Sequence, residues 1–450
     1  MAKKKQIELT IEEKLQNALV PKEEQPYKIP SNWCWLYSNF VVDVRDGTHD
    51  TPKYISEGYP LITSKNLKNN NIDFDKVNYI SKEDYEKINL RSKVDIGDVL
   101  FSMIGTIGNP VLIKGQTNYA IKNVALFKDI NLINMTFFRF YLETKFVIDK
   151  MKKEAKGSTQ KFVSLKYLRN FPICYPSLEE QQRIVNRIES LFAKLDRAKE
   201  LIENTLAQFE QNKMAILHKA FTGELTAKWR KENNIDLSSW EKIKLGKVLL
   251  PMQTKKPTGQ FFRYIDIDAI DNKRQIVKAP KLILTEKAPS RASRGVETGN
   301  ILFSMVRPYL KNIAQIDSDL SDCIASTGFY VCRCKPELNS RFLYYLFIFD
   351  KTIDYLMQFM KGDNSPSIRK DDLLNMKIDL PTIEEQQEIV NILDKLLAKY
   401  NKIKNLEQQL EKIELLKKAI LAKAFRGELG TNNPDEESAE NLLKEILAEK

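Results

Sequence analysis

Histidine is the side chain best suited to acid–base chemistry near neutral pH, and this chain has only two, His49 and His218. His49 lies in the predicted loop 46–49 and His218 in a predicted helix, and neither has the sequence neighbours of a metal site or a catalytic triad. A second copy of that helix has Ala422 where the first has His218. We therefore interpret His218 as a helix surface residue, and His49 as a turn residue or a DNA contact.

Other patterns that could support catalysis are incomplete. The stretch 105–108 lacks the full G-x-G-x-x-G of a dinucleotide site, and the chain contains no G-x-x-x-x-G-K-[ST] phosphate loop. Glu154 and Lys156, following Asp149, could imitate part of a nuclease site, but carboxylates and lysines at this spacing are common on helices. The sequence thus predicts no catalytic residue, and no metal or cofactor held by this chain.

The cysteines and the hydropathy indicate a cellular compartment. The five cysteines are scattered, odd in number and without C-x-x-C spacing: Cys34, Cys174, Cys323, Cys332 and Cys334. The chain has no run of 18 apolar residues, and its first residues, Met-Ala-Lys-Lys-Lys, do not lead into the apolar core of a signal peptide. We expect a protein of the reducing cytoplasm.

The distribution of charge indicates a polyanionic partner. The net charge is +11, and two segments hold the excess: residues 31–176 carry 21 basic and 15 acidic side chains, and residues 233–380 carry 23 and 17. Each segment is therefore +6. Phosphate contacts supply general affinity for DNA while a few loop side chains choose bases, so a pair of basic domains suits DNA reading.

Polar and basic loops supply the candidate DNA contacts. In the first segment they are the run 63–71, with Ser64, Lys65, Asn66, Lys68 and Asn69, and the turn Gly157, Ser158, Thr159, Gln160 and Lys161. In the second they are Arg291, Arg294, Arg307, Asn364 and Ser365. A solvated turn is the alternative for the asparagine-rich run.

An internal repeat predicts the architecture. Residues 176–195 match 381–400 at 11 of 20 positions, and 215–225 match 419–429 at 9 of 11. Weaker matches precede each copy: GDVLFSM at 97–103 pairs with GNILFSM at 299–305, and Trp33 pairs with Trp240. The chain therefore reads as a domain followed by a helix, twice, with different loops on one scaffold.

The repeated helices have the periodicity of a coiled coil. Ile184, Ile188, Leu191, Leu195, Ala198 and Ile202 alternate spacings of four and three, as do Ile389, Leu393, Leu396, Tyr400 and Ile403. A proline precedes each start, paired glutamates occupy each first turn, and Gly223 and Gly427 stand at the ends. About 44 residues at 1.5 Å each give a rod of roughly 65 Å. Ordinary bundle core is the alternative for these apolar stripes.

These signals predict an α+β protein, in which two long antiparallel coiled-coil helices separate two mixed α/β recognition domains as a pseudo-twofold internal repeat. Apolar runs at 99–104, 111–113, 301–306 and 329–332 predict strands, while 136–151 and 340–360 predict helices. The expected divisions are an N-terminal segment 1–30, domains 31–176 and 233–380, a central helix and linker 177–232, a C-terminal helix 381–430 and a tail 431–450. We expect residues 431–440 to be flexible, and the amphipathic stretches 1–20 and 441–449 to meet.

At these residues the sequence resembles the specificity subunit of a type I restriction-modification enzyme, almost from end to end. The matching pieces are the entry 30–33, DGTHDTPKY at 46–54, GTIGN at 105–109, GSTQK at 157–161, and P-x-x-E-E-Q-Q followed by A-F-x-G-E-L in both copies. With this resemblance, Gly47, Thr48, His49, Gly105 and Thr106 join the candidate DNA contacts.

The resemblance implies a subunit without catalysis of its own. It implies two target recognition domains, each reading half of a bipartite DNA site, and docking of two adenine methyltransferase subunits and, in the full complex, motor-nuclease subunits. S-adenosylmethionine, ATP and Mg²⁺ would act in those partners. Gln181, Gln182, Gln386 and Gln387 are candidate partner contacts, with a solvated first turn as the alternative.

The second domain departs from the pattern, with PMQTKK at 251–256 in place of the DGTH loop and GDNSP at 362–366 in place of GSTQK. These differences leave its specific DNA contacts open. Two other classes of function also remain: a self-contained nuclease or methyltransferase, and a coiled-coil scaffold that binds only proteins.

Overall fold

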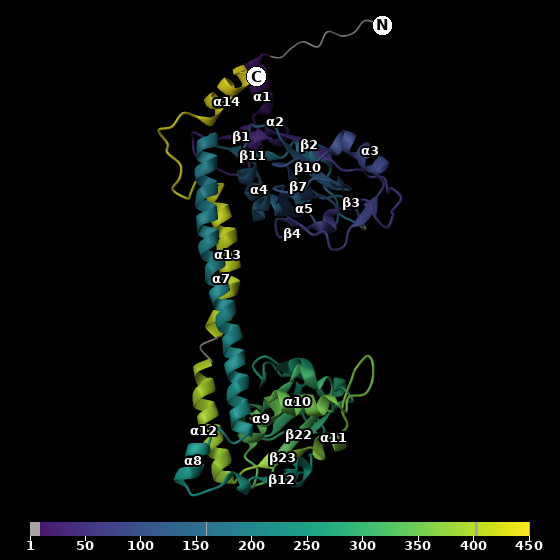
Figure 1. Cartoon of the computed structure of the whole chain (residues 1–450), viewed down its shortest axis with the longest axis vertical. Coiled ribbons are helices and arrows are strands. Elements are labelled where there is room, and N and C mark those ends of the chain that lie inside the picture. The colour runs from purple at the N-terminus through teal and green to yellow at the C-terminus, as the bar shows by residue number, and fades with distance from the viewer. Residues whose placement is uncertain (1–9, 159, 401–403, 450) are drawn as a thin grey trace. The chain divides into compact units, whose positions relative to one another are not determined.

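The computed structural model describes residues 10–158, 160–400 and 404–449. It divides into two compact units: unit 1 contains residues 1–201 and 408–450, and unit 2 contains residues 202–407. The boundary between them falls within one helix, α7 (Leu178–Phe221). Each unit is described by itself (Figure 1).

The centre of unit 1 is a four-stranded antiparallel sheet in the order β2-β10-β7-β8. All four residues of β7 are buried, which shows that both faces of this strand are covered. The strands are β2 (Val42–Asp46), β7 (Val99–Ser102), β8 (Gly108–Leu112) and β10 (Val124–Asp129). The predicted strands 99–104 and 111–113 are therefore present, and β8 begins earlier than expected.

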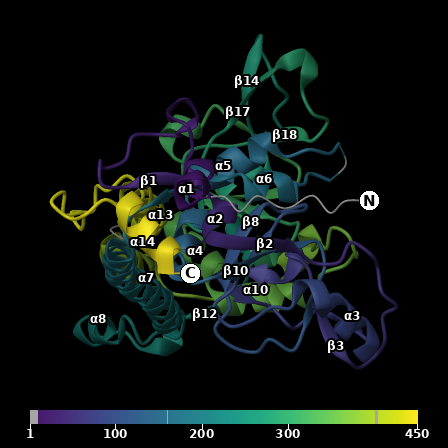
Figure 2. The same cartoon turned by 90° about the horizontal axis from the view of Figure 1, so that it is seen from above.

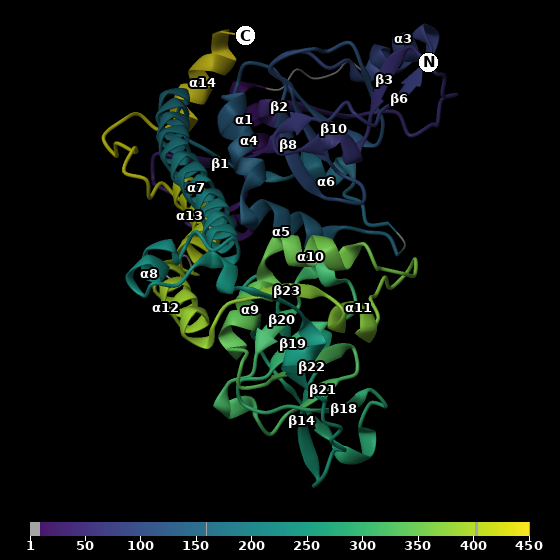
Figure 3. The ribbon, with the colours of Figure 1, turned by 60° about the horizontal axis from the view of Figure 1, so that its bottom comes forward.

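A smaller sheet and a hairpin lie beside this centre. The smaller sheet has the order β6-β3-β9, with β3 parallel to β9, and the hairpin is β4-β5. Figure 3 shows β3 and β6 beside α3. Their bounds are β3 (Tyr59–Ile62), β4 (Leu67–Lys68), β5 (Asn71–Ile72), β6 (Asn78–Ile80), α3 (Lys82–Ser92) and β9 (Ala120–Ile121).

The helices after the sheet correct one prediction. The expected single helix 136–151 is two helices, α4 (Met135–Glu143) and α5 (Lys145–Glu154), because Thr144 adopts an extended conformation between them. The Thr144 hydroxyl accepts a hydrogen bond from the amide of Val147 and so caps α5. Unit 1 also contains α2 (Ser38–Val41), α6 (Leu165–Arg169), and the antiparallel pair β1 (Cys34–Tyr37) and β11 (Pro172–Tyr175).

Unit 2 repeats this topology. Its central sheet has the order β13-β22-β19-β20, its hairpin is β15-β16, and β12 pairs with β23. A second sheet, β17-β14-β21-β18, again has one parallel pair, β14 with β21. In Figure 3, β19 and β22 lie between this second sheet and α9. The strand β18 is an addition, and the short 3₁₀ turn η6 (Thr285–Lys287) follows β17 where α3 follows β6 in unit 1.

The strands of unit 2 are β12 (Glu241–Lys244), β13 (Leu249–Leu250), β14 (Phe261–Ile265), β15 (Ile270–Asp271), β16 (Ile276–Val277), β17 (Lys281–Leu284), β18 (Ala292–Gly295), β19 (Ile301–Ser304), β20 (Ile313–Gln315), β21 (Ile324–Ser326), β22 (Phe329–Cys334) and β23 (Lys377–Leu380). In Figure 2, β14 and β17 lie at the outer edge of the unit. The predicted helix 340–360 is again two, α9 (Ser340–Ile348) and α10 (Asp350–Met357), separated at the extended Phe349. They are followed by α11 (Lys370–Leu374), and α8 (Ala227–Glu232) follows α7.

The second copy of the long helix is described as α12 (Ile383–Tyr400) and α13 (Lys404–Ala424); Ile403 lies outside the described residues. In unit 1, α13 runs antiparallel to the first part of α7, because Lys417 pairs with Asp196 at 2.5 Å and Glu414 with Lys199 at 3.3 Å (Figure 1). In unit 2, the end of α7 and α12 contribute to one apolar core. The predicted seam residues Ile184, Ile188, Ile389 and Leu393 are fully buried.

Short 3₁₀ turns connect these elements: η1 (Lys22–Glu24), η2 (Ser64–Asn66), η3 (Leu237–Ser239), η4 (Leu245–Val248), η5 (Ile267–Ala269), η6 (Thr285–Lys287), η7 (Pro308–Leu310) and η8 (Ser318–Leu320). None of the helices in the described ranges is long and apolar enough to cross a membrane.

The C-terminal tail is bound to unit 1, which corrects the expectation of a flexible segment. The indole of Trp33 donates to Asn432 Oδ1 at 2.9 Å, and the Thr431 hydroxyl donates to Glu180 Oε1 at 2.6 Å. Farther along, α14 (Ala439–Glu449) packs against α1 (Ile11–Ala18). The predicted meeting of the two amphipathic ends is confirmed for the described residues.

Unit 2 contains a corresponding set of hydrogen bonds, formed by different residues. Glu385, fully buried at the start of α12, accepts from Thr226 at 2.6 Å, Arg230 at 2.5 Å and the indole of Trp240 at 2.9 Å. Thr226 follows the end of α7, as Thr431 follows the end of α13. In each unit, therefore, the chain leaving one long helix caps the buried glutamate that begins the other.

Candidate nucleic-acid interface

Two predicted loops of unit 1 meet at the turn between β9 and β10. The amide of Asn123 donates to the carbonyl of Thr48 at 3.1 Å, and the Ser64 hydroxyl donates to the carbonyl of Asn123 at 3.3 Å. The Ser102 hydroxyl, at the end of β7, donates to the Ser64 carbonyl at 3.2 Å. Loops that are distant in sequence thus form one surface at the end of β7.

His49 is held on this surface by both ring nitrogens. Its Nε2 lies 2.9 Å from Asp46 Oδ2, and its Nδ1 lies 2.9 Å from Asn123 Oδ1. Asp46 is buried and also pairs with Arg91, whereas the His49 side chain is 59% exposed. These two contacts hold the imidazole ring in one orientation on the loop surface. His49 therefore stays a turn residue or candidate DNA contact, held in place by Asp46 and Asn123.

Two of the predicted DNA contacts are structural instead. Gly47 is buried, and a side chain there would place Cβ 2.3 Å from the carbonyl oxygen of Ile121. Asn66 is also buried: its Oδ1 accepts from the amide and hydroxyl of Thr63 at 3.0 and 2.9 Å, and its Nδ2 donates to the carbonyl of Asp73 at 3.0 Å. The predictions for Gly47 and Asn66 are therefore wrong, since these residues shape the loops.

The other predicted residues of the two loops 46–49 and 63–71 are accessible. Lys65, Lys68 and Asn69 are exposed, while Thr48 and Ser64 are half-buried. Lys68 pairs with Asp73 at 2.7 Å, and Asn69 adopts a left-handed conformation with φ +48°. These five stay candidate DNA contacts.

The GTIGN and GSTQK segments lie side by side. The amide of Gly105 donates to the carbonyl of Lys161 at 2.8 Å, and the amide of Val163 donates to that of Met103 at 2.9 Å. Gly157 has φ +105°, and a Cβ there would lie 2.3 Å from the carbonyl oxygen of Gln160. The exposed members of the predicted set are Gly105, Thr106, Gly157, Ser158, Gln160 and Lys161; Thr159 lies outside the described residues.

Unit 2 builds the corresponding junction from different residues. The amide of Arg307 donates to the carbonyl of Pro366 at 2.8 Å, and the amide of Ile368 donates to that of Met305 at 3.0 Å. Asn364 and Ser365 are exposed in this hairpin. The structure therefore brings Arg307, Asn364 and Ser365 together, although GDNSP and GSTQK differ in sequence.

Of the two other predicted arginines of unit 2, Arg291 lies beside this junction. The carbonyl of Arg291 accepts from the amide of Thr327 at 2.9 Å, and the carbonyl of the next residue, Gly328, accepts from Met305 at 2.9 Å. Arg291 is exposed. Arg294, in β18, is half-buried, and its Nε has no hydrogen-bond partner among the described residues.

A groove of about 430 Å³ opens next to Arg307. Its lining includes the apolar residues Ile267, Ile270 and Val306 and the polar residues Asp268, Asn272, Asn312 and Ser365. Sequence reasoning missed Asp268, Asn272 and Asn312. The signal available was positional: Asp268 lies in η5, the counterpart of the η2 turn that carries Ser64 and Lys65 in unit 1.

The predicted partner-binding glutamines divide into two kinds. Gln181 and Gln386 are fully buried; their Oε1 atoms accept from the amides of Asn134 and Asn339, each at 2.8 Å, and their Nε2 atoms donate to proline carbonyls. Their assignment as partner contacts is wrong, and so is the alternative of a solvated turn. Amide side chains at these positions fix the start of each long helix to its own domain.

Gln182 and Gln387 are exposed and remain candidates for partner contacts. Their Oε1 atoms accept from the side-chain amides of Asn134 and Asn339, each at 2.9 Å. The geometry of these glutamines is the same in both units, so the chain carries two equivalent exposed faces at the starts of α7 and α12.

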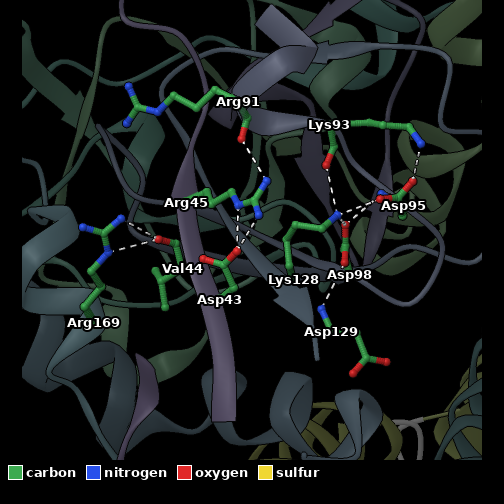
Figure 4. A network of polar contacts seen from close by, with 10 residues as sticks. All are labelled: Asp43, Val44, Arg45, Arg91, Lys93, Asp95, Asp98, Lys128, Asp129 and Arg169. Carbon is green, nitrogen blue, oxygen red and sulfur yellow. Dashed lines mark hydrogen bonds and ion pairs between the residues drawn. The ribbon is translucent and has the colours of Figure 1, made fainter. Parts of the chain in front are cut away.

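A polar network next to β2 and β10 stabilises unit 1 away from these loops (Figure 4). Lys128 donates to Asp95 and Asp98, each at 2.8 Å, and Asp98 is buried. Hydrogen bonds from Lys128 and Lys93 hold the pKa of Asp95 below its ordinary value. Burial opposes the charge of Lys128, but its bonds to the two carboxylates outweigh burial and raise its pKa. The ammonium thus compensates a buried carboxylate.

A comparison with protein families settles where the chain belongs. The model of the type I restriction modification DNA specificity domain matches residues 47–208 and residues 240–415. The chain belongs to this family. The two matches correspond to the two copies of the internal repeat, and each begins inside one of the two mixed α/β domains and ends within a long helix.

Individual relatives agree with this assignment. The EcoBI specificity subunit of Escherichia coli is 32% identical over 222 residues, which cover 47% of this chain and 46% of that subunit. The StySPI specificity subunit of Salmonella potsdam is 24% identical over 457 residues, covering 94% of this chain and 96% of that subunit. Similarity to the family's specificity subunits therefore extends over nearly the whole chain.

Solved structures share the fold. One is a chain from a solved structure that concerns complex assembly and conformational transition of the type I R-M system. It aligns with a TM-score of 0.67 at 20% identity, covering 90% of this chain and all of that one. The HsdS subunit of Thermoanaerobacter tengcongensis aligns with a TM-score of 0.51 at 20% identity, covering 90% and 99%. These likenesses confirm the fold class of two mixed α/β domains with long helices.

Proposed function

We propose that this chain is the specificity subunit of a type I restriction-modification enzyme that reads a discontinuous duplex DNA site, one half with each domain. The observation that carries the proposal is the repeated loop junction. Gly105 and Lys161 in unit 1, and Arg307 and Pro366 in unit 2, form the same 2.8 Å backbone hydrogen bond, yet their exposed neighbours differ. One frame with two sets of side chains suits two different half-sites.

Charge supports the same proposal. Each recognition segment carries a net charge of +6, and exposed lysines, amides and hydroxyls surround both junctions. Lysines supply sequence-independent affinity for phosphates, while amide and guanidinium groups can bond base edges. Binding should therefore weaken steeply as salt is raised.

Two equivalent faces support docking of two copies of one methyltransferase subunit. Gln182 and Asn186 are exposed at the start of α7, as Gln387 and Asn391 are at the start of α12. The apolar side chains that begin these helices, Leu178 and Ile383, are both 39% exposed. Equal faces on one chain fit identical partners. Motor-nuclease subunits would join through that assembly.

Catalysis and cofactors belong, in this proposal, to the partner subunits in the cytoplasm. S-adenosylmethionine, ATP and Mg²⁺ would bind there. The described residues contain no group of three or more histidine, cysteine or acidic side chains placed to hold a metal ion. Tight binding of S-adenosylmethionine by the purified chain alone would contradict this division of labour.

The test is selection of bound duplexes from a random library by the chain in complex with its methyltransferase subunits. We expect two short motifs separated by a constant gap, and replacement of residues 233–380 by the matching segment of a relative should change only one motif. A single continuous motif, or a change in both halves, would contradict the proposal. Failure to bind any duplex would favour a protein-binding scaffold.

A further inference from the structure

Arg307 has a backbone conformation that costs an arginine free energy. Its φ is +48° and its ψ is 59°, in the left-handed region, and Pro308 follows it. Left-handed geometry favours glycine, and the residue before a proline prefers extended geometry. The corresponding residue of unit 1 is Gly105, with φ +75°, whose amide makes the equivalent hydrogen bond. A glycine at 307 would therefore serve the fold better.

The Arg307 side chain is positioned but not neutralised. Its Nη2 donates to the carbonyl of Asn364 at 2.9 Å, which steadies one edge of the guanidinium. No carboxylate pairs with it among the described residues, and it is exposed at the wall of the groove. A guanidinium carries five N–H donors, so most of its donors remain available.

The groove suits base edges better than phosphate. Besides Arg307 it contains Asp268, an exposed carboxylate for which the described residues contain no ion-pair partner. That carboxylate would repel a phosphate, whereas base edges present both acceptors and donors. Guanine offers O6 and N7 as paired acceptors in the major groove, and cytosine offers an amino donor.

We infer that Arg307 is a specificity-determining residue that donates to O6 and N7 of one guanine in the half-site read by unit 2. The inference rests on the proposed function and adds the residue and the base that it selects. The backbone strain at 307 is retained because glycine could not supply the two parallel hydrogen bonds. In unit 1 the corresponding position makes no such contact, since Gly105 has no side chain.

The test compares R307G and R307K with the wild-type chain, each assembled with the methyltransferase subunits. R307G should unfold at the same temperature or a higher one, because it relieves the strain. In site selection it should lose preference for guanine at one position by about tenfold or more, with all other positions unchanged. R307K is the charge control: it should keep general affinity but lose most of that preference, because an ammonium lacks the planar fork.

Each other outcome overturns the inference. An unchanged motif for R307G would show that Arg307 reads no base, and a uniform loss of affinity across all sequences would identify a phosphate contact. A lower unfolding temperature with an unchanged motif would show that the arginine serves the fold. The wild-type chain separates failure of this inference from failure of the proposed function. A continuous motif for the wild-type chain would contradict the proposed function, whatever the variants do.

Discussion

Units 1 and 2 arrange the same strands in the same order, but they differ in where charge is buried. At the turn before β7, unit 1 has Asp98, and at the turn before β19, unit 2 has Asn300. Both side chains accept from the backbone amide three residues earlier, at 2.7 and 3.0 Å. Asp98 requires the ammonium of Lys128, whereas Asn300 is neutral. One local structure is thus built with and without a buried charge.

The loop surfaces differ more than the frame does. Asn123, which holds His49 in unit 1, corresponds to Gly328 in unit 2, and Gly105 corresponds to Arg307. By contrast, the bonds that join each domain to its long helix agree to within about 0.1 Å: Asn134 to Gln182 and Asn339 to Gln387 are both 2.9 Å. The comparison teaches that the attachment of each long helix is held constant while the loop surface with the candidate DNA contacts varies.

The largest difference should follow removal of the arginine beside each buried glutamate. In unit 2, R230M would leave the fully buried Glu385 without its cation. Arg230 is itself only 8% exposed, so the ion pair that is lost is shielded from solvent. We expect a loss of about 3–5 kcal/mol in the free energy of unfolding of unit 2. In unit 1, R183M should cost less than R230M. Glu180 is also buried, but Arg183 is 37% exposed and its charge is screened by solvent, and Glu180 keeps the hydrogen bond from Thr431.

Hydrogen exchange measured by mass spectrometry would resolve the two units. The double variant R230M/E385Q is the control, since it removes the uncompensated charge and should recover part of the loss. Equal effects of R230M and R183M would contradict the view that the two glutamates are compensated differently.

The next effect concerns Lys128 and its counterpart Arg333. K128M should destabilise unit 1 by about 3 kcal/mol, because Asp98 is 2% exposed and would lose the cation that pairs with it. R333M should cost unit 2 about 1 kcal/mol or less, because Arg333 pairs with Glu297, which is 53% exposed. Unit-resolved hydrogen exchange again measures both.

The double variant K128M/D98N reproduces in unit 1 the neutral arrangement of unit 2. It should restore most of the stability lost in K128M. If it did not, the role of Lys128 would be its packing or its bond to the carbonyl of Lys93, and the comparison of charges would not hold.

Part of this organisation could be predicted from the sequence. The duplicated helix, with its proline, glutamates and terminal glycine, indicated two similar units, and the LFSM pairs located the central strands. The break at Thr144 was missed because the sequence there has neither glycine nor proline, and only the threonine hydroxyl caps the next helix. Docking of the tail was not predicted, although the match of GELT at 223–226 with GELGT at 427–431, which places Thr431 opposite Thr226, is a signal that could have found it.

The buried glutamines could not be predicted from residue type. Gln181 and Gln182 are adjacent polar residues in the first turn of a helix, and only the position of Asn134, from another element, decides that the first is enclosed and the second exposed. For the same reason Asn66 was indistinguishable from Lys65 and Asn69. Sequence patterns located the loops, but the burial of individual side chains depends on tertiary contacts.

Removal of the shared asparagine caps should have a smaller effect, equal in the two units. N134A and N339A each remove the side-chain oxygen that accepts from two amides at the start of α4 or α9. Each should cost its own unit about 1 kcal/mol. Unequal costs in hydrogen exchange would contradict the conclusion that helix attachment is constant, and T136A, whose side chain makes no capping bond, is a matched control for unit 1.

The smallest expected effect is a pH dependence confined to unit 1. The pKa of Asp95 lies below its ordinary value of 3.8 because Lys128 and Lys93 bond its charged form. Its contribution to stability is therefore full above that ordinary value and is lost as pH falls through the lowered pKa. The contribution is small because Asp95 is 48% exposed. The stability difference between wild type and D95N in unit 1 should be constant at neutral pH and should shrink only below about pH 4, as measured by unit-resolved hydrogen exchange after brief acid incubation. A difference that grew on acidification would mean that Asp95 is stabilised as the neutral acid, and Lys128 would then be serving Asp98 alone.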